Sequence, residues 1–489
     1  MSEKESLYNY IKKNIVEGQL PKEFSLPKNT SENQIRFADG AQDGIAIYHM
    51  GNADVSEESI RLLNEWSKAV SDGNFELGYQ KLEEFAKSNT PLNSIDEFER
   101  NIIDHASELN AENIHRFAVE CIMESLNVDM VKYGLEALEV FSEPGEELKD
   151  IIRTLGLSDE FALFSIFNML SWENANEEVF SLAKKVRGWG RVHAVARLEP
   201  ETEAIRRWLL EEGINNEVIP AYSALEVYQK ADVCDLLKSE LTEKELCQIG
   251  SILCALLDEG PTVGISAVED ADVMITDFLK QVQRSKPVLS LCETVRELSE
   301  ETGSEEVFAL CKEILHSAAV REAVLCWVKE AEGLELAEYL NIDYFEPLYH
   351  CIVKDFDKHF YKCDRLVKND SFREKVFQLF REHLPMEQMV SEPQDCMGLG
   401  KEYENYSRLV YLVQNLSEYP FCGTDFVELA LKSPVISNRN MALRVLNSWC
   451  EKKQCSLQEL SNKLFLDVEE LKKKEVSESV KKNIEQYGF

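Results

Sequence analysis

Glycine and proline are scarce in this chain of 489 residues, which has 21 and 13 of them. An all-β protein needs a turn signal about every 8 to 12 residues, and these two residue types supply most such signals. Their shortage argues against an all-β fold and favours long helices. Hydrophobic residues make up 44%, and the length exceeds the roughly 250–300 residues that one core supports. We therefore expect several domains or a repeat array.

The motifs of several common enzyme classes are also missing. The chain has no His-Glu-x-x-His, no Gly-x-Ser-x-Gly and no Gly-x-x-x-x-Gly-Lys-Ser/Thr sequence, so the best-known zinc, serine-hydrolase and P-loop sites are absent. No Gly-x-Gly-x-x-Gly stretch is present to hold a dinucleotide. We expect no cofactor, and the balance is against an enzyme.

Long apolar runs and paired cysteines are absent as well. No run approaches the ~18 apolar residues that would span a bilayer, and the N-terminus lacks the pattern of a signal peptide. The thirteen cysteines include no Cys-x-x-Cys pair, which indicates reduced thiols. We expect a cytoplasmic protein that does not contact a membrane.

The charge is strongly of one sign. There are 89 acidic residues against 53 lysines and arginines, a net charge of −36. This field repels nucleic acid, so no nucleic-acid partner is expected. It favours solubility and attracts a basic partner.

One segment near the N-terminus departs from a helical pattern. Residues 35–49 contain two Asp-Gly pairs, and apolar residues alternate with others after Gly44. Such pairs form turns, and the alternation suggests a small β-hairpin. We place it in an N-terminal segment, residues 1–55.

From residue 56 onward the pattern is helical and repeats. Capping boxes are predicted at residues 94–97 and 242–245. Several helices share an apolar i, i+3, i+4, i+7 spacing, and the last members of successive sets lie 29, 31 and 27 residues apart, at Leu138, Phe167, Leu198 and Leu225. A drifting period near 30 residues accommodates two helices and two turns, which indicates an array of αα-hairpins.

The clearest single unit lies at residues 433–446, with a proline-bearing turn, an arginine and an Ala-Leu-x-x-Leu helix. It resembles the second half of a HEAT or armadillo-type repeat. Residues 35–49 and 188–200 also resemble segments of an uncharacterised bacterial family of HEAT-like proteins. The resemblance implies an all-α fold, an α-solenoid of HEAT-like hairpins over residues 56–489, with a break expected near 259–290.

Residues 188–200 are the first candidate site. Trp189, His193 and Arg197 are spaced four residues apart and share one helical face. His193 and Arg197 stand where most sister helices carry apolar residues. An indole, an imidazole and a guanidinium together could bind an anion or a carboxylate-bearing peptide. The alternative is structural: Arg197 pairs with Glu201, and His193 is satisfied between helices.

A second reading places a small-ligand or enzyme pocket between residues 35–49 and 188–200. Its acid–base group would be His49 or His193, and its carboxylate Asp39, Asp43 or Glu199. Turn formation is the simpler role for the two aspartates. Together with Arg191, these residues complete the candidate binding set.

A third candidate is a metal site at Glu346, His350, His359 and Cys363. Each half is an i, i+4 pair on one predicted helix, and a hairpin could join two pairs of zinc ligands into a tetrahedron. The spacing matches no known zinc signature, and ordinary hairpin residues are the alternative.

These observations favour a binding protein. We expect a scaffold that presents a concave helical surface to another protein or peptide, with a basic partner favoured by the net charge. The face that carries Trp189, His193 and Arg197 is expected to contribute.

Overall fold

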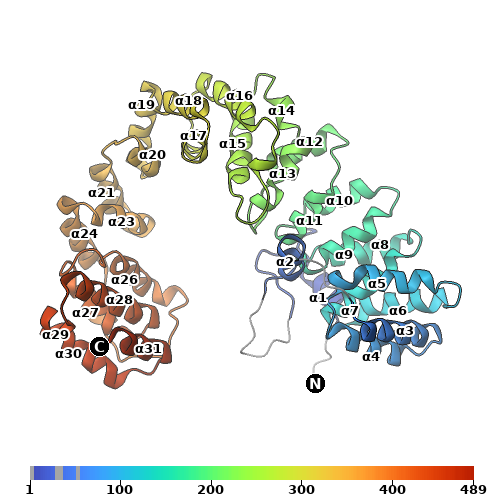
Figure 1. Cartoon of the computed structure of the whole chain (residues 1–489). Coiled ribbons are helices and arrows are strands. Elements are labelled where there is room, and N and C mark those ends of the chain that lie inside the picture. The colour runs from blue at the N-terminus through green and yellow to red at the C-terminus, as the bar shows by residue number, and fades with distance from the viewer. Residues whose placement is uncertain (1–4, 28–36, 51–54) are drawn as a thin grey trace. The chain divides into compact units, whose positions relative to one another are not determined.

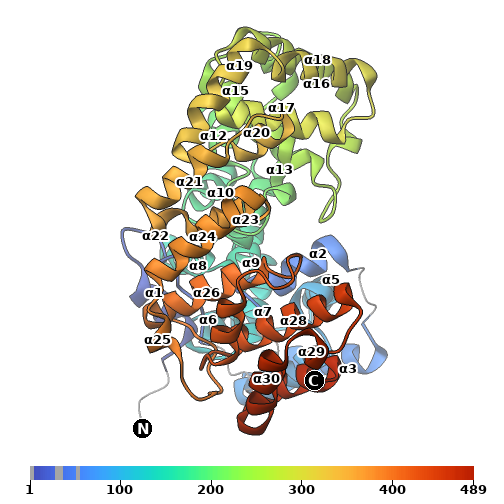
Figure 2. The same ribbon diagram turned by 90° about the vertical axis from the view of Figure 1, so that its left-hand side faces the viewer.

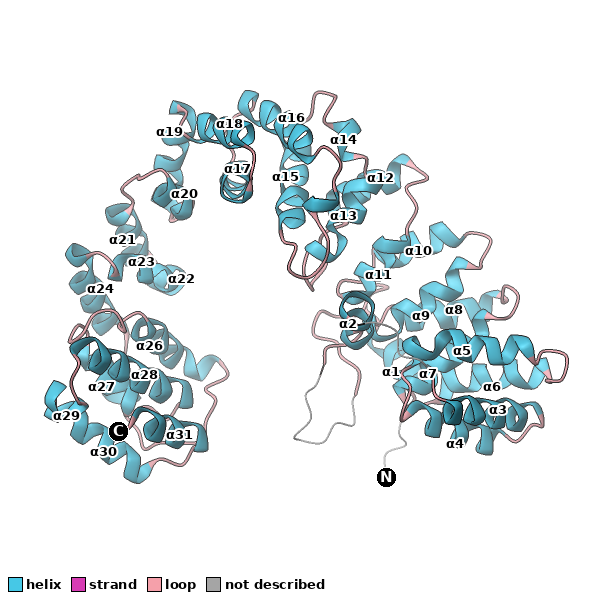
Figure 3. Cartoon of the chain, in the orientation of Figure 1, coloured by secondary structure: helices cyan, strands magenta, loops and turns pink. Residues whose placement is uncertain are grey.

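The computed structural model describes residues 5–27, 37–50 and 55–489. Regular structure in these residues is helical, and Figure 3 shows helices and loops but no strand among them. Two isolated bridges, Val16 with Gln19 and Cys396 with Val435, are the only β-type pairings described. The prediction of an all-α fold is confirmed.

The predicted β-hairpin is wrong. Residues 41–49 form helix α2 (Ala41–His49), which begins after Gly40 in the left-handed conformation, with φ 74°. Glycine adopts this conformation at no steric cost, so the turn leads into a helix. Ile35 and Arg36 lie outside the described residues.

The chain divides into two compact units. Unit 1 contains residues up to Lys286 together with Thr294–Ile314, and unit 2 contains Pro287–Glu293 and Leu315–Phe489. The boundary falls inside α17 (Leu289–Glu301). Helices α1 (Leu7–Asn14) and α2, which precede residue 56, belong to unit 1.

The remaining helices of unit 1 follow one another through short turns (Figure 1): α3 (Glu57–Ser71), α4 (Phe75–Ala86), α5 (Pro91–Asp104), α6 (Ala111–Glu124), α7 (Val128–Glu139), α8 (Glu146–Gly156), α9 (Asp159–Leu170), α10 (Ala175–Ala183), α11 (Trp189–Arg197), α12 (Glu203–Glu212), α13 (Ala221–Lys230), α14 (Val233–Leu236), α15 (Glu243–Leu257), α16 (Ala271–Arg284) and α18 (Glu305–Leu315). Neighbours in sequence pack in pairs, α6 on α7, α8 on α9, α10 on α11 and α12 on α13. The second members also pack on each other, so that α5, α7, α9, α11 and α13 form one layer.

Unit 2, yellow-gold to red in Figures 1 and 2, contains α19 (Ala318–Trp327), α20 (Leu334–Tyr339), α21 (Phe345–Lys354), α22 (Phe356–His359), α23 (Cys363–Val367), α24 (Asp370–His383), α25 (Met386–Met389), α26 (Glu404–Gln414), α27 (Thr424–Leu431), α28 (Ile436–Lys453), α29 (Leu457–Leu460), α30 (Asn462–Lys474) and α31 (Glu478–Tyr487). The longest of these, α28, packs against α26, α27 and α31. It begins within residues 433–446, the stretch whose sequence resembles half of a HEAT-type repeat.

Side-chain caps explain where several helices begin. Thr242 caps α15 in a capping box with Glu245, as predicted. The box predicted at Ser94 is wrong, because α5 already begins at Pro91 after Thr90. Proline fits the first helical position, where no N–H is needed. Ser94 is instead buried inside α5, and its hydroxyl donates to the carbonyl of Thr90, 2.9 Å away.

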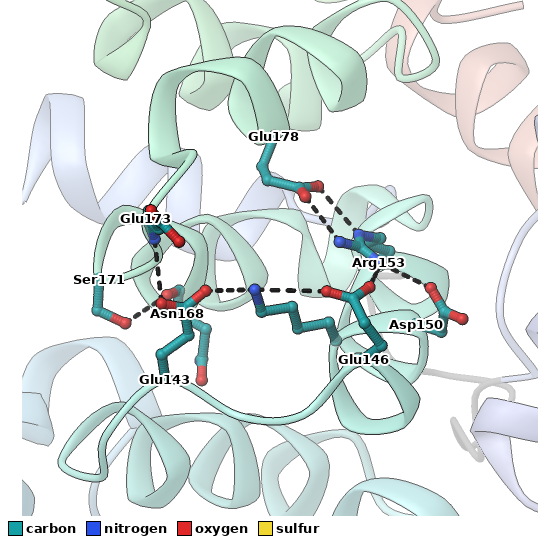
Figure 4. Close-up of polar contacts among 9 residues, drawn as sticks. Glu143, Glu146, Asp150, Arg153, Asn168, Ser171, Glu173 and Glu178 are labelled. Atoms are coloured by element: carbon teal, nitrogen blue, oxygen red, sulfur yellow. Dashed lines mark hydrogen bonds and ion pairs between the residues drawn. The ribbon is translucent and has the colours of Figure 1, made fainter.

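A surface network connects α8 with α10 and the turn before α8 (Figure 4). Arg153 of α8 binds both carboxylate oxygens of Glu178 of α10, at 3.0 and 2.7 Å. Lys149 pairs with Glu143 and Glu146, and Glu143 accepts from the backbone N–H of Glu173. Networks of this kind stabilise more than isolated surface pairs.

Two further expectations concern the cysteines and the membrane. The thirteen cysteines are free thiols, and those at 121, 292, 311, 351 and 363 are buried. Cys234 and Cys326 are exposed. In the described part of the chain, no helix combines the length and apolar character needed to cross a bilayer.

The core of unit 2 contains a buried ion pair. The side chains of Arg439 and Glu475 are both 0% exposed, and two guanidinium nitrogens bind the carboxylate at 2.7 and 2.9 Å. The same guanidinium donates to the carbonyls of Ser433 and Gln394. It thereby fixes the start of α28 to two loops.

Replacing Arg439 with methionine should strongly destabilise unit 2. Glu475 would remain buried without its partner, which costs about 3–5 kcal/mol of unfolding free energy. Arg444→Met, an exposed position on the same helix, is the matched control and should change stability by less than about 0.5 kcal/mol. Calorimetric unfolding measures both, and equal effects of the two variants would contradict this role of Arg439.

Candidate functional site

The two stretches singled out by the sequence lie against each other. Helix α2 contacts residues of α7, α11 and α13 in unit 1, and it lies beside α9 and α11 in Figure 1. The backbone N–H of Gly40 donates to Glu160 Oε2 of α9 at 3.1 Å. We call this contact region the α2 junction. It contains Asp43, Gly44, Tyr48, Lys132, Glu160, Trp189, His193 and Tyr222.

A buried ion triad fixes α2 to the layer beneath it. Lys132 Nζ of α7 lies 2.6 Å from Asp43 Oδ2 of α2 and 2.7 Å from Glu160 Oε1 of α9. Lys132 is 3% exposed. Burial acts to lower the pKa of this ammonium, but the two carboxylates outweigh it and raise the pKa above its usual value. Lys132 therefore stays positively charged at neutral pH.

Trp189 gives the junction its apolar surface. Its ring centroid lies 4.8 Å from that of Tyr222 and 6.1 Å from that of Tyr48. Gly44 of α2 packs directly on the indole, and a Cβ added there would stand 2.2 Å from Trp189 Cε3. This contact explains why the second Asp-Gly pair has glycine inside a helix.

The glycines beside Trp189 make room for Asp159. A Cβ at Gly188 would stand 2.3 Å from Asp159 Oδ2, and the N–H of Gly190 donates to Asp159 Oδ1 at 3.0 Å. Gly40 approaches the same residue, with 2.5 Å between its added Cβ and the Asp159 carbonyl oxygen. Burial raises the pKa of Asp159 to about 6, although the Gly190 N–H opposes the shift.

His193 and Arg197 have structural surroundings that differ from both sequence readings. His193 is 1% exposed, and its Nε2 has no hydrogen-bond partner among the described residues. Burial, then the charges of Arg197 and Lys132, lowers the pKa of His193 to about 3. Arg197 donates to the His193 carbonyl and lies over Phe167 instead of pairing with Glu201.

The other candidate binding residues are dispersed around the junction. Arg191 donates to the carbonyls of Val186 and Asn215, and Asp39 accepts from the backbone of Leu26 at 2.9 Å. His49 lies 2.7 Å from the Tyr222 hydroxyl. Glu199 is exposed, and its side chain takes no part in the junction contacts described above.

The side chains of the α2 junction are closely packed. Trp189 is 5% exposed, and a cavity of about 70 Å³ lies at its edge, beside Asp39, Asp159 and Lys185. This volume holds a few water molecules at ~10–15 Å³ each. The two stretches thus meet as predicted for the pocket hypothesis, but they fill the space between them.

The four predicted metal ligands do not form a metal site. Glu346 and His350 are exposed neighbours on α21, whereas Cys363 is fully buried. Among the described residues, no group of three or more His, Cys, Asp or Glu side chains is placed to hold an ion. The i, i+4 spacing was correct for Glu346 and His350, but the chain between α21 and α23 turns Cys363 into the core.

Sequence reasoning missed the carboxylates behind the triad. Both oxygens of Glu136 are buried and have no hydrogen-bond partner among the described residues. Burial, then the charges of Glu99 and Asp43, raises the pKa of Glu136 well above its usual value. Burial and the neighbouring Glu99 raise the pKa of Glu139 to about 7. No local sequence signal marks these carboxylates, because Glu99 and Asp43, which act on Glu136, lie on other helices.

Comparison of the chain with protein-family models, curated proteins and solved structures finds no match. The resemblance to HEAT and armadillo repeats therefore stays a prediction.

Gly44→Ala tests the packing of the α2 junction. The new methyl group would collide with the Trp189 ring, and such overpacking costs about 1–3 kcal/mol of unfolding free energy. Gly303→Ala is the control, since a Cβ there meets no atom within 4 Å. Urea unfolding should separate the two variants. Equal stability of the two variants would show that position 44 can hold a side chain and would contradict the close packing against Trp189.

Glu139→Gln tests the acidic surroundings of the junction. A carboxyl whose folded pKa is about 7, above the usual 4.5, stabilises fully below pH 4.5, and this contribution is lost as pH rises through 7. Glutamine is uncharged, like the protonated carboxyl, so it avoids the cost of a buried negative charge at pH 8. After allowing for solvent screening, we expect the variant to gain about 1 kcal/mol of unfolding free energy at that pH. Its melting temperature should then lie about 2–4 °C above that of wild type.

At pH 4.5 the melting temperatures of Glu139→Gln and wild type should coincide. Glu177→Gln, an exposed glutamate on α10, should change neither value. A difference between wild type and Glu139→Gln that stays constant with pH would contradict the raised pKa.

Proposed function

We propose that the protein is a HEAT-like α-solenoid that binds another protein through its helical surfaces. The layer of α5, α7, α9, α11 and α13 in unit 1, in which the last four helices each pack on the preceding one, supports this assignment. Stacked hairpins leave extended surfaces on which a protein partner can lie. This layered stacking is the observation that carries the proposal.

The chemistry of the partner follows from charge. The chain carries −36, so a basic protein is attracted over a distance and its encounter is accelerated. Nucleic acid and anionic membrane surfaces are repelled by the same field. A basic polypeptide is the partner class that this charge favours.

The binding surface differs from the one expected from the sequence. Trp189 and His193 are covered by α2, so they support the fold of unit 1 and do not face a partner. The enzyme alternative loses support for the same reason, because a substrate would have to displace α2 from a buried ion triad. Binding is therefore assigned to exposed helix surfaces away from the α2 junction.

Affinity capture with the full chain as bait tests this function. We expect a basic protein to be retained at low ionic strength and released as salt rises, because the Debye length falls from about 30 Å at 0.01 M to about 8 Å at 0.15 M. Excess polyglutamate is the control, since it removes proteins held only by non-specific ion exchange. Loss of every captured protein to polyglutamate, or recovery of a small molecule alone, would contradict the proposal.

A further inference from the structure

An open groove lies between α4 and α6, away from the α2 junction. Both helices pack against α3 and α7, and the space between them measures about 540 Å³. This is within the ~300–1,000 Å³ of typical ligand sites. Phe75, Tyr79 and Phe117 line its floor, and Leu126 lies at one end.

The floor of the groove consists of aromatic rings, and its one hydroxyl group already has a hydrogen-bond partner. The rings of Phe75 and Phe117 meet edge to face, with centroids 5.6 Å apart. The Tyr79 hydroxyl lies 3.0 Å from Ser125 Oγ, so it needs no further partner. Leu126 is 42% exposed. An apolar side chain entering the groove would therefore meet ring surfaces and one leucine, and would leave no polar group unpaired.

The rim is acidic. Glu76, Glu120 and Glu124 line the groove and are exposed, and none of them forms an ion pair with a described residue. By contrast, Lys81 of α4 is held by Glu65 at 2.6 Å. Arg116 lies over the Phe75 ring, 4.6 Å from its centroid, so one cation already contacts this aromatic floor.

The rim carboxylates are not explained by the stability of the helices. Glu120 and Glu124 are i, i+4 on α6, and like charges at this spacing destabilise a helix by about 0.2–0.5 kcal/mol. Glu124 also stands at the C-terminal end of α6, where the helix dipole favours a cation. A bound cationic group would relieve both effects.

We propose that this groove docks an amphipathic basic segment of a partner protein. Its apolar side chains lie on Phe75, Tyr79 and Phe117, and its lysines or arginines pair with the glutamates of the rim. A second copy of this chain is disfavoured because both copies carry −36. The inference rests on the proposed binding function, and it names the surface and the partner chemistry.

A synthetic helical peptide with leucine and tryptophan on one face and lysine on the other is the probe. It is labelled, and its binding to the full-length protein is followed by fluorescence anisotropy at low ionic strength. The same peptide with glutamate in place of lysine should not bind. The double variant Glu120→Gln, Glu124→Gln should bind the lysine peptide about three- to tenfold more weakly, because two rim pairs are lost.

The matched control is Glu177→Gln, Glu201→Gln, which removes two exposed charges elsewhere in unit 1 and keeps the net charge equal to that of the rim variant. It should bind the peptide like wild type. If both double variants bound the lysine peptide equally weakly, only the net charge of the protein would matter, and the proposal of a docking groove would be overturned.

The two proposals fail in different ways. If wild type does not bind the lysine peptide while a captured protein partner cross-links elsewhere, the groove is wrong and the binding function stands. If the rim variant binds the peptide as tightly as wild type, the groove is also wrong. If no protein partner survives polyglutamate and the peptide does not bind, both proposals fall.

Discussion

The buried ammonium of Lys132 is the interaction on which the organisation of unit 1 depends. It joins three segments that are distant in sequence, through Asp43 of α2, Glu160 of α9 and its own helix α7. Burying a charge is costly unless it is paired and hydrogen-bonded. Here one cation meets two carboxylates, and removing it would leave two buried negative charges without their shared counter-charge. Such a triad contributes more to a single docked position for α2 than to overall stability.

The glycines complete this arrangement in the apolar part of the junction. Gly44 lets α2 lie on the indole of Trp189, and Gly188 and Gly190 make room for Asp159. Each contact requires the absence of a side chain on one partner. As a result, Trp189 and His193, which the sequence marked as a candidate site, are buried inside unit 1. We therefore propose that a protein partner binds at exposed surfaces such as the groove between α4 and α6.

Much of the helical pattern could be predicted from the sequence, because apolar periodicity and caps such as Thr242 are local signals. The position of α2 could not. Residues 44–49 alternate like a strand, whereas in the fold they belong to α2, whose Asp43 and Gly44 contact Lys132 and Trp189. The buried charges of α7 could not be predicted either, since no local pattern distinguishes Lys132 and Glu136 from exposed charges, yet both are buried. The proximity of residues 35–49 to 188–200 was predicted correctly. The sequence also suggested an open pocket between them, but the described residues pack closely there.

Hydrogen exchange of α2 in Lys132→Met tests this account most directly. Without the ammonium, Asp43 and Glu160 repel each other inside the protein, and α2 should leave the layer to reach solvent. The account predicts that the amides of residues 41–49 lose protection in the variant, while those of α6, which lies outside the junction, keep theirs. Unchanged protection of α2 would show that the aromatic contacts alone hold the helix and would contradict the central place given to Lys132.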